Sequence, residues 1–139
     1  MQVQGRIEIM DLVNRYSDAA NRQHPEDMAS VYAPQGRLLA FGNEFYVGRD
    51  RILEIFRASM VRVEYLTQIC AAGIVNVDGD RATGRWTVTK FAKHADGDKL
   101  TYFQGTYEDT MIRTDEGWLF EQRILSRTAQ ARFEALLRH

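Results

Sequence analysis

The closing third of the chain, residues 101–127, constrains the fold more than any other stretch. Two long runs of β-forming residues, 101–113 and 118–125, are separated by a turn that contains Gly117. Long strand-like runs joined by a glycine-containing turn predict an antiparallel hairpin. A fold of this chain therefore has to accommodate two strands that are long for a protein of this size.

Two further β-rich runs precede the hairpin, at residues 65–77 and 81–94. Side chains alternate between the two faces of a strand, so the second run places three residues on one face, namely Trp86, Val88 and Lys90. Together with the hairpin, the two runs predict a four-stranded antiparallel meander. Strands of this length twist, so the sheet is expected to curve strongly.

The N-terminal part of the chain has a helical pattern instead. Residues 5–22 carry apolar side chains at spacings of four, three and four: Ile9, Val13, Tyr16 and Ala20. A second helix is predicted from Pro25 to Tyr32, because proline favours the first helical position and Pro34 disfavours helix in the residue before it. A third helix follows Gly48. The prediction is an α+β fold in which N-terminal helices pack on a curved antiparallel sheet and enclose a pocket.

Three shorter segments complete the prediction. A short apolar strand is expected from Leu38 to Phe41, and Gly42-Asn43 is expected to form a tight turn into a segment at residues 45–47. The final segment, residues 129–139, is compatible with either a short helix or a frayed end.

Length and charge exclude several classes of protein. The 139 residues fit a single domain over residues 1–139, and 18 basic against 19 acidic residues give no indication of nucleic-acid binding. No apolar run is long enough for a membrane span, and the N-terminus lacks the apolar segment of a signal peptide. Cys70 is the single cysteine, which excludes an internal disulfide and favours a cytoplasmic location.

Several short motifs occur in an order that spans nearly the whole chain. They are Arg15-Tyr16 with Asn21, Gly48-Arg49, the segment Val77-Asp78-Gly79-Asp80-Arg81-Ala82, Gly105-x-Tyr107-x-Asp109, and Gly117-Trp118 with Arg123. In this order they resemble the SnoaL-like group of the nuclear-transport-factor-2-like (NTF2-like) superfamily. The resemblance implies the NTF2-like cone, a helix-covered curved sheet with a pocket inside.

The resemblance implies less about function, because this superfamily carries many activities on one scaffold. The favoured hypothesis is a cofactor-independent lyase or isomerase of dehydratase, isomerase or cyclase type, acting on a hydrophobic substrate with a carbonyl or hydroxyl group. The alternative is a non-catalytic ligand-binding or assembly domain. Relatives place a catalytic His where this chain has Gln68, and an Asp where it has Asn21, so a histidine base is not expected. The three histidines, His24, His94 and His139, are expected to be exposed.

Three residues are candidates for catalysis. Tyr16 stands at the position of the family's catalytic tyrosine, although it could equally be a core aromatic residue. Lys90 shares a strand face with Trp86, so it is a base or Schiff-base amine if that face points inward, and a solvated lysine if it does not. Asp109 lies near the position of an acid in the oxyanion hole of ketosteroid-isomerase relatives.

Four residues are candidates for substrate binding. Asn21 and Gln68 can donate and accept hydrogen bonds, although Asn21 could instead end the first helix. Trp86 is expected in the lining of an apolar cavity. Arg127 occupies a position where similar enzymes contact a substrate anion or carbonyl, but a surface ion pair would explain it as well.

Metals, cofactors and partners complete the set of expectations. No His or Cys pair has ligand spacing, so neither a metal nor a cofactor is expected, and Cys70 is interpreted as a small buried apolar residue. A homodimer is expected, because the outer face of the sheet carries Phe91, Ile112 and Leu119 and relatives commonly cover such a face by packing sheet on sheet.

Overall fold

The structure is a computed structural model that describes residues 3–40, 42 and 44–134. Its helices are α1 (Val3–Asn21), α2 (Pro25–Ser30) and α3 (Arg49–Met60). Its strands are β1 (Tyr32–Ala40), β2 (Tyr46–Val47), β3 (Val63–Asp78), β4 (Arg81–His94), β5 (Lys99–Thr114) and β6 (Gly117–Glu134). The predicted order, helices first and long strands afterwards, is confirmed.

All six strands form one sheet in the order β2-β1-β6-β5-β4-β3. Strands β3 to β6 form the predicted antiparallel meander. The prediction of a wholly antiparallel sheet is wrong, however, because β1 lies parallel to β6, with Leu38 opposite Arg123. This pairing joins segments more than 80 residues apart in the sequence, and no local sequence signal specifies it.

The segment around Pro34 differs most from the prediction. Helix α2 ends at Ser30, and Tyr32 begins a strand instead of ending the helix. The pairing of β1 with β6 is irregular between Tyr32 and Arg37, which is the stretch that contains Pro34. Proline has no N–H to donate to a ladder, so it is tolerated where the pairing is interrupted.

The remaining boundaries are set by pairing with neighbouring strands. Strand β1 runs from Tyr32 to Ala40, while Phe41 and Asn43, on which the predicted strand end and turn depend, lie outside the described residues. A helix over residues 129–134 is wrong, because this segment continues β6 and pairs with β5 as far as Glu134. Residues 135–139 lie outside the described part of the chain.

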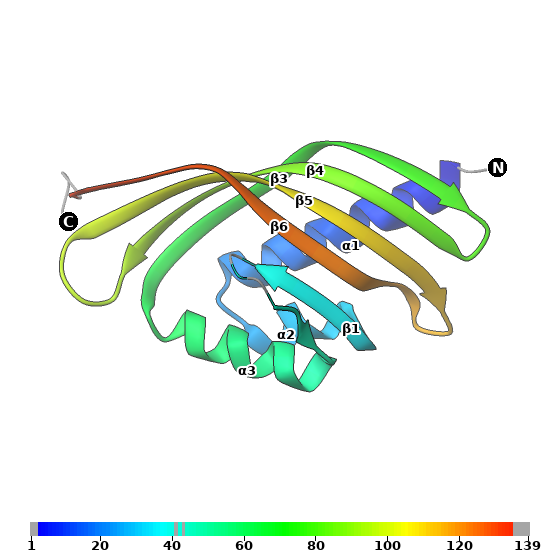
Figure 1. Cartoon of the computed structure of the whole chain (residues 1–139), viewed down its shortest axis with the longest axis horizontal. Helices are drawn as coiled ribbons and strands as arrows, with labels where there is room; N and C mark the ends of the chain where they lie inside the picture. Colours follow the sequence, from blue (N-terminus) through cyan, green and yellow to red (C-terminus); the bar gives the residue numbers. More distant parts are fainter. Residues whose placement is uncertain (1–2, 41, 43, 135–139) are drawn as a thin grey trace.

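The helices lie on one face of the curved sheet and leave the other face uncovered (Figure 1). The buried face of α1 contains the predicted Ile9, Val13, Tyr16 and Ala20. Beyond the helices, the ends of β4, β5 and β6 project toward the side where the described chain ends (Figure 1). None of the described helices is long and apolar enough to cross a membrane.

Candidate functional site

Rows of paired residues on the inner face of the sheet bring distant parts of the chain together. One row consists of Gln68, Lys90, Phe103 and Gln130, from β3, β4, β5 and β6. Residues directly opposite each other in an antiparallel ladder point to the same face. Because Gln68 is buried and bonds to α1, Lys90 also lies on the inner face, which settles the orientation that the sequence left open.

The centre of the inner face holds a buried ion pair between Asp109 and Arg123. Arg123 Nε donates to Asp109 Oδ1 at 2.8 Å, and Nη2 donates to Oδ2 at 3.1 Å. Both side chains are fully buried, and the Arg123 guanidinium lies 3.7 Å from the ring centroid of Tyr107 and 4.1 Å from that of Phe120. The sequence identified Arg123 only as part of a motif, and its central position was missed.

Burial and pairing act in opposite directions on this ion pair. Burial raises the pKa of Asp109, while the Arg123 charge and its hydrogen bonds lower it. For Arg123, burial disfavours the charged form, but the Asp109 carboxylate outweighs burial and raises its pKa. For Asp109 burial outweighs these effects and its pKa is raised, whereas arginine does not lose its proton in proteins, so Arg123 keeps its positive charge beside this carboxyl group. Both carboxylate oxygens of Asp109 are engaged, so its catalytic role stays a prediction.

Tyr16 lies in an aromatic cluster beside this ion pair. Its ring meets those of Tyr32 and Tyr107 edge-on, with centroid distances of 6.3 Å in each case. Burial raises the pKa of Tyr16, and the charge of Arg123 partly opposes this effect. The surroundings of Tyr16 are therefore those of a core aromatic residue, one of the two interpretations that the sequence allowed.

Asn21 and Gln68 bond to each other and tie α1 to β3. Asn21 Nδ2 donates to the Gln68 carbonyl oxygen at 3.1 Å, and the Gln68 backbone N–H donates to Asn21 Oδ1 at 2.6 Å. The side-chain amide of Gln68 donates to Ser17 Oγ at 3.1 Å. Asn21 is also the last residue of α1. These bonds satisfy the Asn21 amide and half-satisfy the Gln68 amide within the protein, so their substrate-binding roles stay predictions.

Trp86 is buried on the inner face against two glycines. A Cβ at Gly73 would overlap the ring, so glycine is needed there, and one at Gly84 would make a tight contact of 3.0 Å with Trp86 Nε1. Among the described residues, Trp86 Nε1 has no hydrogen bond of good geometry. It lies close enough to the Asp109 carboxylate to lower the pKa of that carboxyl. Its contacts are those of a core residue beside the ion pair.

Two of the predicted site residues, Lys90 and Arg127, line one hollow at the end of the sheet that projects beyond the helices. We call it the distal basin; its volume is about 380 Å³ and its lining residues are Lys90, Ala92, His94, Thr101, Phe103, Arg127, Gln130 and Arg132. Lys90 Nζ lies 5.6 Å from the centroid of the Phe103 ring. Burial, reinforced by the charge of Arg123, lowers the pKa of Lys90 to about 8.

Arg127, on β6, lines the distal basin. Its Nη1 donates to Gln130 Oε1 at 2.8 Å. The surface ion pair offered as an alternative is not observed, because no carboxylate of the described residues pairs with Arg127. Within the described part of the chain, its positive charge therefore has no acid at ion-pair distance.

His94 and Arg132 also line the distal basin, although neither was predicted from the sequence as a site residue. The expectation that His94 is exposed is wrong: it is half-buried, and its Nε2 lies 2.7 Å from Thr101 Oγ1. His94 is four residues beyond Lys90 on β4, so the same alternation that orients Lys90 predicts that both share a face. His24 is exposed before α2, as predicted, while His139 lies outside the described residues.

Cys70 is half-buried, packs against the core and belongs to no metal-binding cluster of described residues. Burial raises the pKa of the Cys70 thiol to about 11, so it is not a thiolate at neutral pH. No group of three or more His, Cys, Asp or Glu side chains suited to a metal ion occurs in the described ranges.

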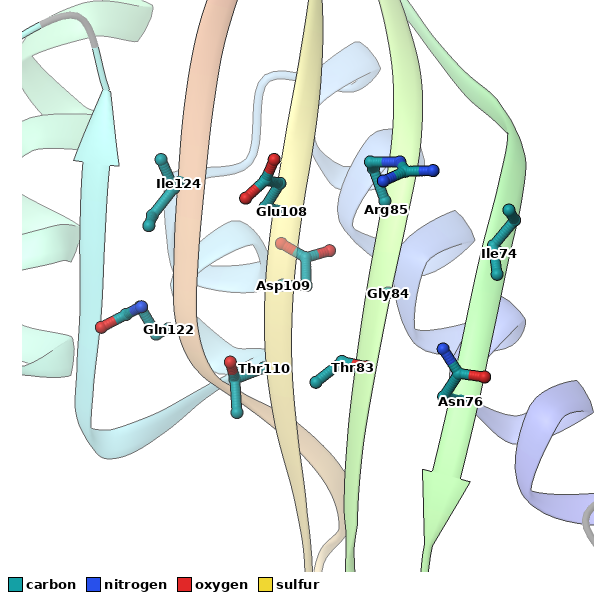
Figure 2. Close-up of a pocket in the computed structure, with 10 residues that line it drawn as sticks. All are labelled: Ile74, Asn76, Thr83, Gly84, Arg85, Glu108, Asp109, Thr110, Gln122 and Ile124. Atoms are coloured by element: carbon teal, nitrogen blue, oxygen red, sulfur yellow. The ribbon is translucent and has the colours of Figure 1, made fainter.

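A second hollow, of about 390 Å³, lies on the uncovered outer face of the sheet (Figure 2). Figure 2 shows Arg85 and Glu108 on the neighbouring strands β4 and β5, where they are opposite each other in the ladder. Asp109 also borders this hollow, but its carboxylate bonds to Arg123. The outer hollow therefore contains none of the other predicted site residues.

Solved structures with this fold include proteins of dehydratase type. The chain is similar to a candidate scytalone dehydratase from Novosphingobium aromaticivorans, at 19% identity and a TM-score of 0.88 over 99% of this chain and 91% of that one. It is also similar to the hexachlorocyclohexane dehydrochlorinase LinA-type3 from Novosphingobium barchaimii, at 16% identity and a TM-score of 0.84 over 95% and 92% of the two chains.

A third similar structure, a protein of unknown function from Mycobacterium tuberculosis, is 27% identical with a TM-score of 0.80 over 91% of this chain and 77% of that one. A search of curated protein sequences finds no match. The family model described as the SnoaL-like domain matches residues 1–124. With this match over most of its length and with the NTF2-like cone as its fold, the chain belongs to the SnoaL-like family.

Proposed function

We propose that this protein is a small-molecule lyase or isomerase whose reaction takes place in the distal basin. The observation that carries the proposal is the position of Lys90 on the inner face, against Phe103 and in the same hollow as Arg127. A pKa of about 8 leaves a substantial fraction of the Lys90 amine neutral slightly above neutral pH. The similarity to dehydratase-type structures supports a reaction of this class.

In the proposed reaction, neutral Lys90 acts as a general base. Its amine removes a proton from the carbon next to a substrate carbonyl; the electron pair of the C–H bond forms a double bond to the carbonyl carbon, and the π pair of the carbonyl moves onto its oxygen. The guanidinium of Arg127 stabilises the negative charge that develops there. The Lys90 ammonium then returns the proton, either to another carbon in an isomerisation or to a departing hydroxyl in a dehydration.

In this proposal, other predicted residues hold the elements around the site in place. Asn21 and Gln68 fix α1 against β3, and Gln68 occupies the position beside Lys90 in the ladder. Asp109 holds Arg123, whose charge helps to lower the pKa of Lys90. A catalytic role for Tyr16 stays a prediction. A cytoplasmic location, in keeping with the free thiol of Cys70, is part of the same proposal.

Proton exchange on a simple ketone tests the proposed reaction. In deuterium oxide, the wild-type protein is expected to accelerate loss of the methyl proton signals of acetophenone, followed by proton NMR. The Lys99→Met variant, which removes an exposed lysine outside the basin, is a matched control and should retain this acceleration. Acetophenone that binds but exchanges no faster than in buffer would contradict the enzyme and favour a non-catalytic binding domain.

We also infer that a second copy of the chain covers the outer face of the sheet. Arg85 and Glu108 lie side by side there, so the face is self-complementary in charge, as a two-fold interface requires. Exposed apolar side chains lie on the same face: Ile74 on β3 is opposite Arg85, and Phe91, which is 40% exposed, lies farther along β4. Leu119, expected to need cover on this face, is instead buried within the chain.

Sedimentation tests the dimer. Wild type is expected to be dimeric at micromolar concentration, and Phe91→Glu is expected to shift it to monomers because two charges would be buried in the interface. Ile7→Glu, at an exposed position of α1, should leave the dimer intact. A stable wild-type monomer would refute the inference.

A further inference from the structure

The distal basin carries an excess of positive charge. Four of its lining residues are basic, and no acidic residue is among the described residues that line it: the basic ones are Lys90, His94, Arg127 and Arg132. A hollow lined by one sign of charge attracts ligands of the opposite sign. The proposed reaction uses Lys90 and Arg127, which leaves Arg132 and His94 without a role.

Arg132 stands beside Thr101 at the outer end of the basin. The ladder places Ala92, Thr101 and Arg132 in one row across β4, β5 and β6. The Thr101 hydroxyl and His94 Nε2 are hydrogen-bonded to each other at 2.7 Å, so two further polar side chains lie at the end of the basin that holds Arg132. Among the described residues, Arg132 has no ion pair, and Glu134, the acid nearest to it along β6, lies 3.6 Å from Lys99 Nζ instead. A planar guanidinium that has no ion pair with any described residue is suited to bind a carboxylate.

Apolar side chains line the basin beside these polar groups. Phe103, which is 5% exposed, lies in the same row as Lys90, and Ala92 lies in the row of Arg132. The row of Lys90 and the row of Arg132 are two residues apart along the strands, which corresponds to about 7 Å. A ligand with one aromatic ring between a carboxylate and a carbonyl is of the same size as this backbone spacing.

We propose that the substrate is an amphipathic carboxylate whose carboxylate binds Arg132 at the outer end of the basin. Its apolar body lies on Phe103, and its carbonyl reaches Lys90 and Arg127 at the inner end. This inference rests on the proposed function and names the substrate class of the same site. It assigns Arg132 as the residue that selects charged over neutral substrates.

A matched pair of probes tests the proposal. 4-Acetylbenzoate carries a carboxylate and an acetyl group on one ring, and 4-acetylbenzamide is its neutral counterpart. By titration calorimetry, wild type is expected to bind the benzoate at least about ten-fold more tightly than the benzamide. Arg132→Gln should reduce this ratio to nearly one by weakening benzoate binding alone, while Arg6→Gln, on the exposed face of α1, should preserve it. Equal binding of the two probes by wild type, or an unchanged ratio in Arg132→Gln, would overturn the proposal.

Methyl-proton exchange of the same probes separates this inference from the proposed function. Selective binding of the benzoate without exchange would leave Arg132 as the carboxylate ligand and refute the enzyme. Exchange at equal rates in both probes would leave the enzyme and refute the carboxylate selectivity. Exchange that is faster for the benzoate in wild type, but not in Arg132→Gln, would support both.

Discussion

Replacing Arg123 with methionine is expected to lower the free energy of unfolding by about 3–5 kcal/mol. The change removes the two hydrogen bonds that Arg123 donates to the Asp109 carboxylate and leaves that carboxyl group buried without its counter-charge. Urea unfolding at neutral pH, followed by tryptophan fluorescence, measures the loss. A loss below about 1 kcal/mol would show that the Asp109 carboxylate is not held as described.

Two comparisons separate the ion pair from the loss of a large side chain. The double variant Asp109→Leu and Arg123→Met removes both charges and is expected to recover most of the lost stability, since apolar replacements of buried ion pairs are often tolerated. Arg81→Met breaks a similar arginine–carboxylate contact with Glu121, at 2.9 Å but largely exposed, and should cost less than about 1 kcal/mol.

Replacing Lys90 with methionine is expected to slow the exchange of ketone protons by about 10²–10⁴-fold, the range typical of a general base. For wild type, the rate should rise about ten-fold per pH unit below the pKa of about 8 and level off above it, because only the neutral amine accepts a proton. NMR exchange rates across this pH range measure both effects. A rate that continues to rise toward the ordinary pKa of lysine would contradict the burial of Lys90.

Stability provides the control for the Lys90 variant. Below a pH of about 8 the Lys90 side chain of the folded protein is a largely buried ammonium. Its burial destabilises the folded state relative to the unfolded chain, in which the ammonium is solvated. Between this pKa and the ordinary pKa of lysine the unfolded state binds more protons, so wild-type stability should rise with pH in that window. Lys90→Met should therefore be at least as stable as wild type at neutral pH, and a loss of exchange could not be attributed to unfolding.

Local patterns in the sequence determined the elements and much of their orientation. The alternation over residues 81–94 placed Lys90 on the same face as Trp86 and Val88, and the structure confirms this, because a period of two is imposed by the backbone of any strand. The same alternation extends to His94, so the sequence could have predicted that His94 lies on the same face as Lys90. Tyr32 was assigned to a helix because its strand depends on β6, which is remote in the sequence.

The composition of the site was decided only by the tertiary structure, through two irregularities in the pairing of β5 with β6. The ladder pairs Met111 with Phe120 but Thr110 with Gln122, so β6 accommodates one extra residue there. Without this bulge Arg123 would face outward, away from Asp109, because a shift of one residue moves a side chain to the other face.

The second irregularity acts in the same way on the distal basin. Gly105 pairs with Arg127, whereas Gln104 pairs with Ala129, so one residue is again inserted between them. Arg127 and Arg132 are five residues apart and would face opposite sides of a regular strand, yet both line the distal basin. The sequence by itself determined the scaffold and placed Lys90 on one face with Trp86 and Val88. Only the tertiary structure decided that this face points inward and, through the long-range pairing of β6, which charges lie near Lys90, since a bulge has no marker in the local pattern of residues.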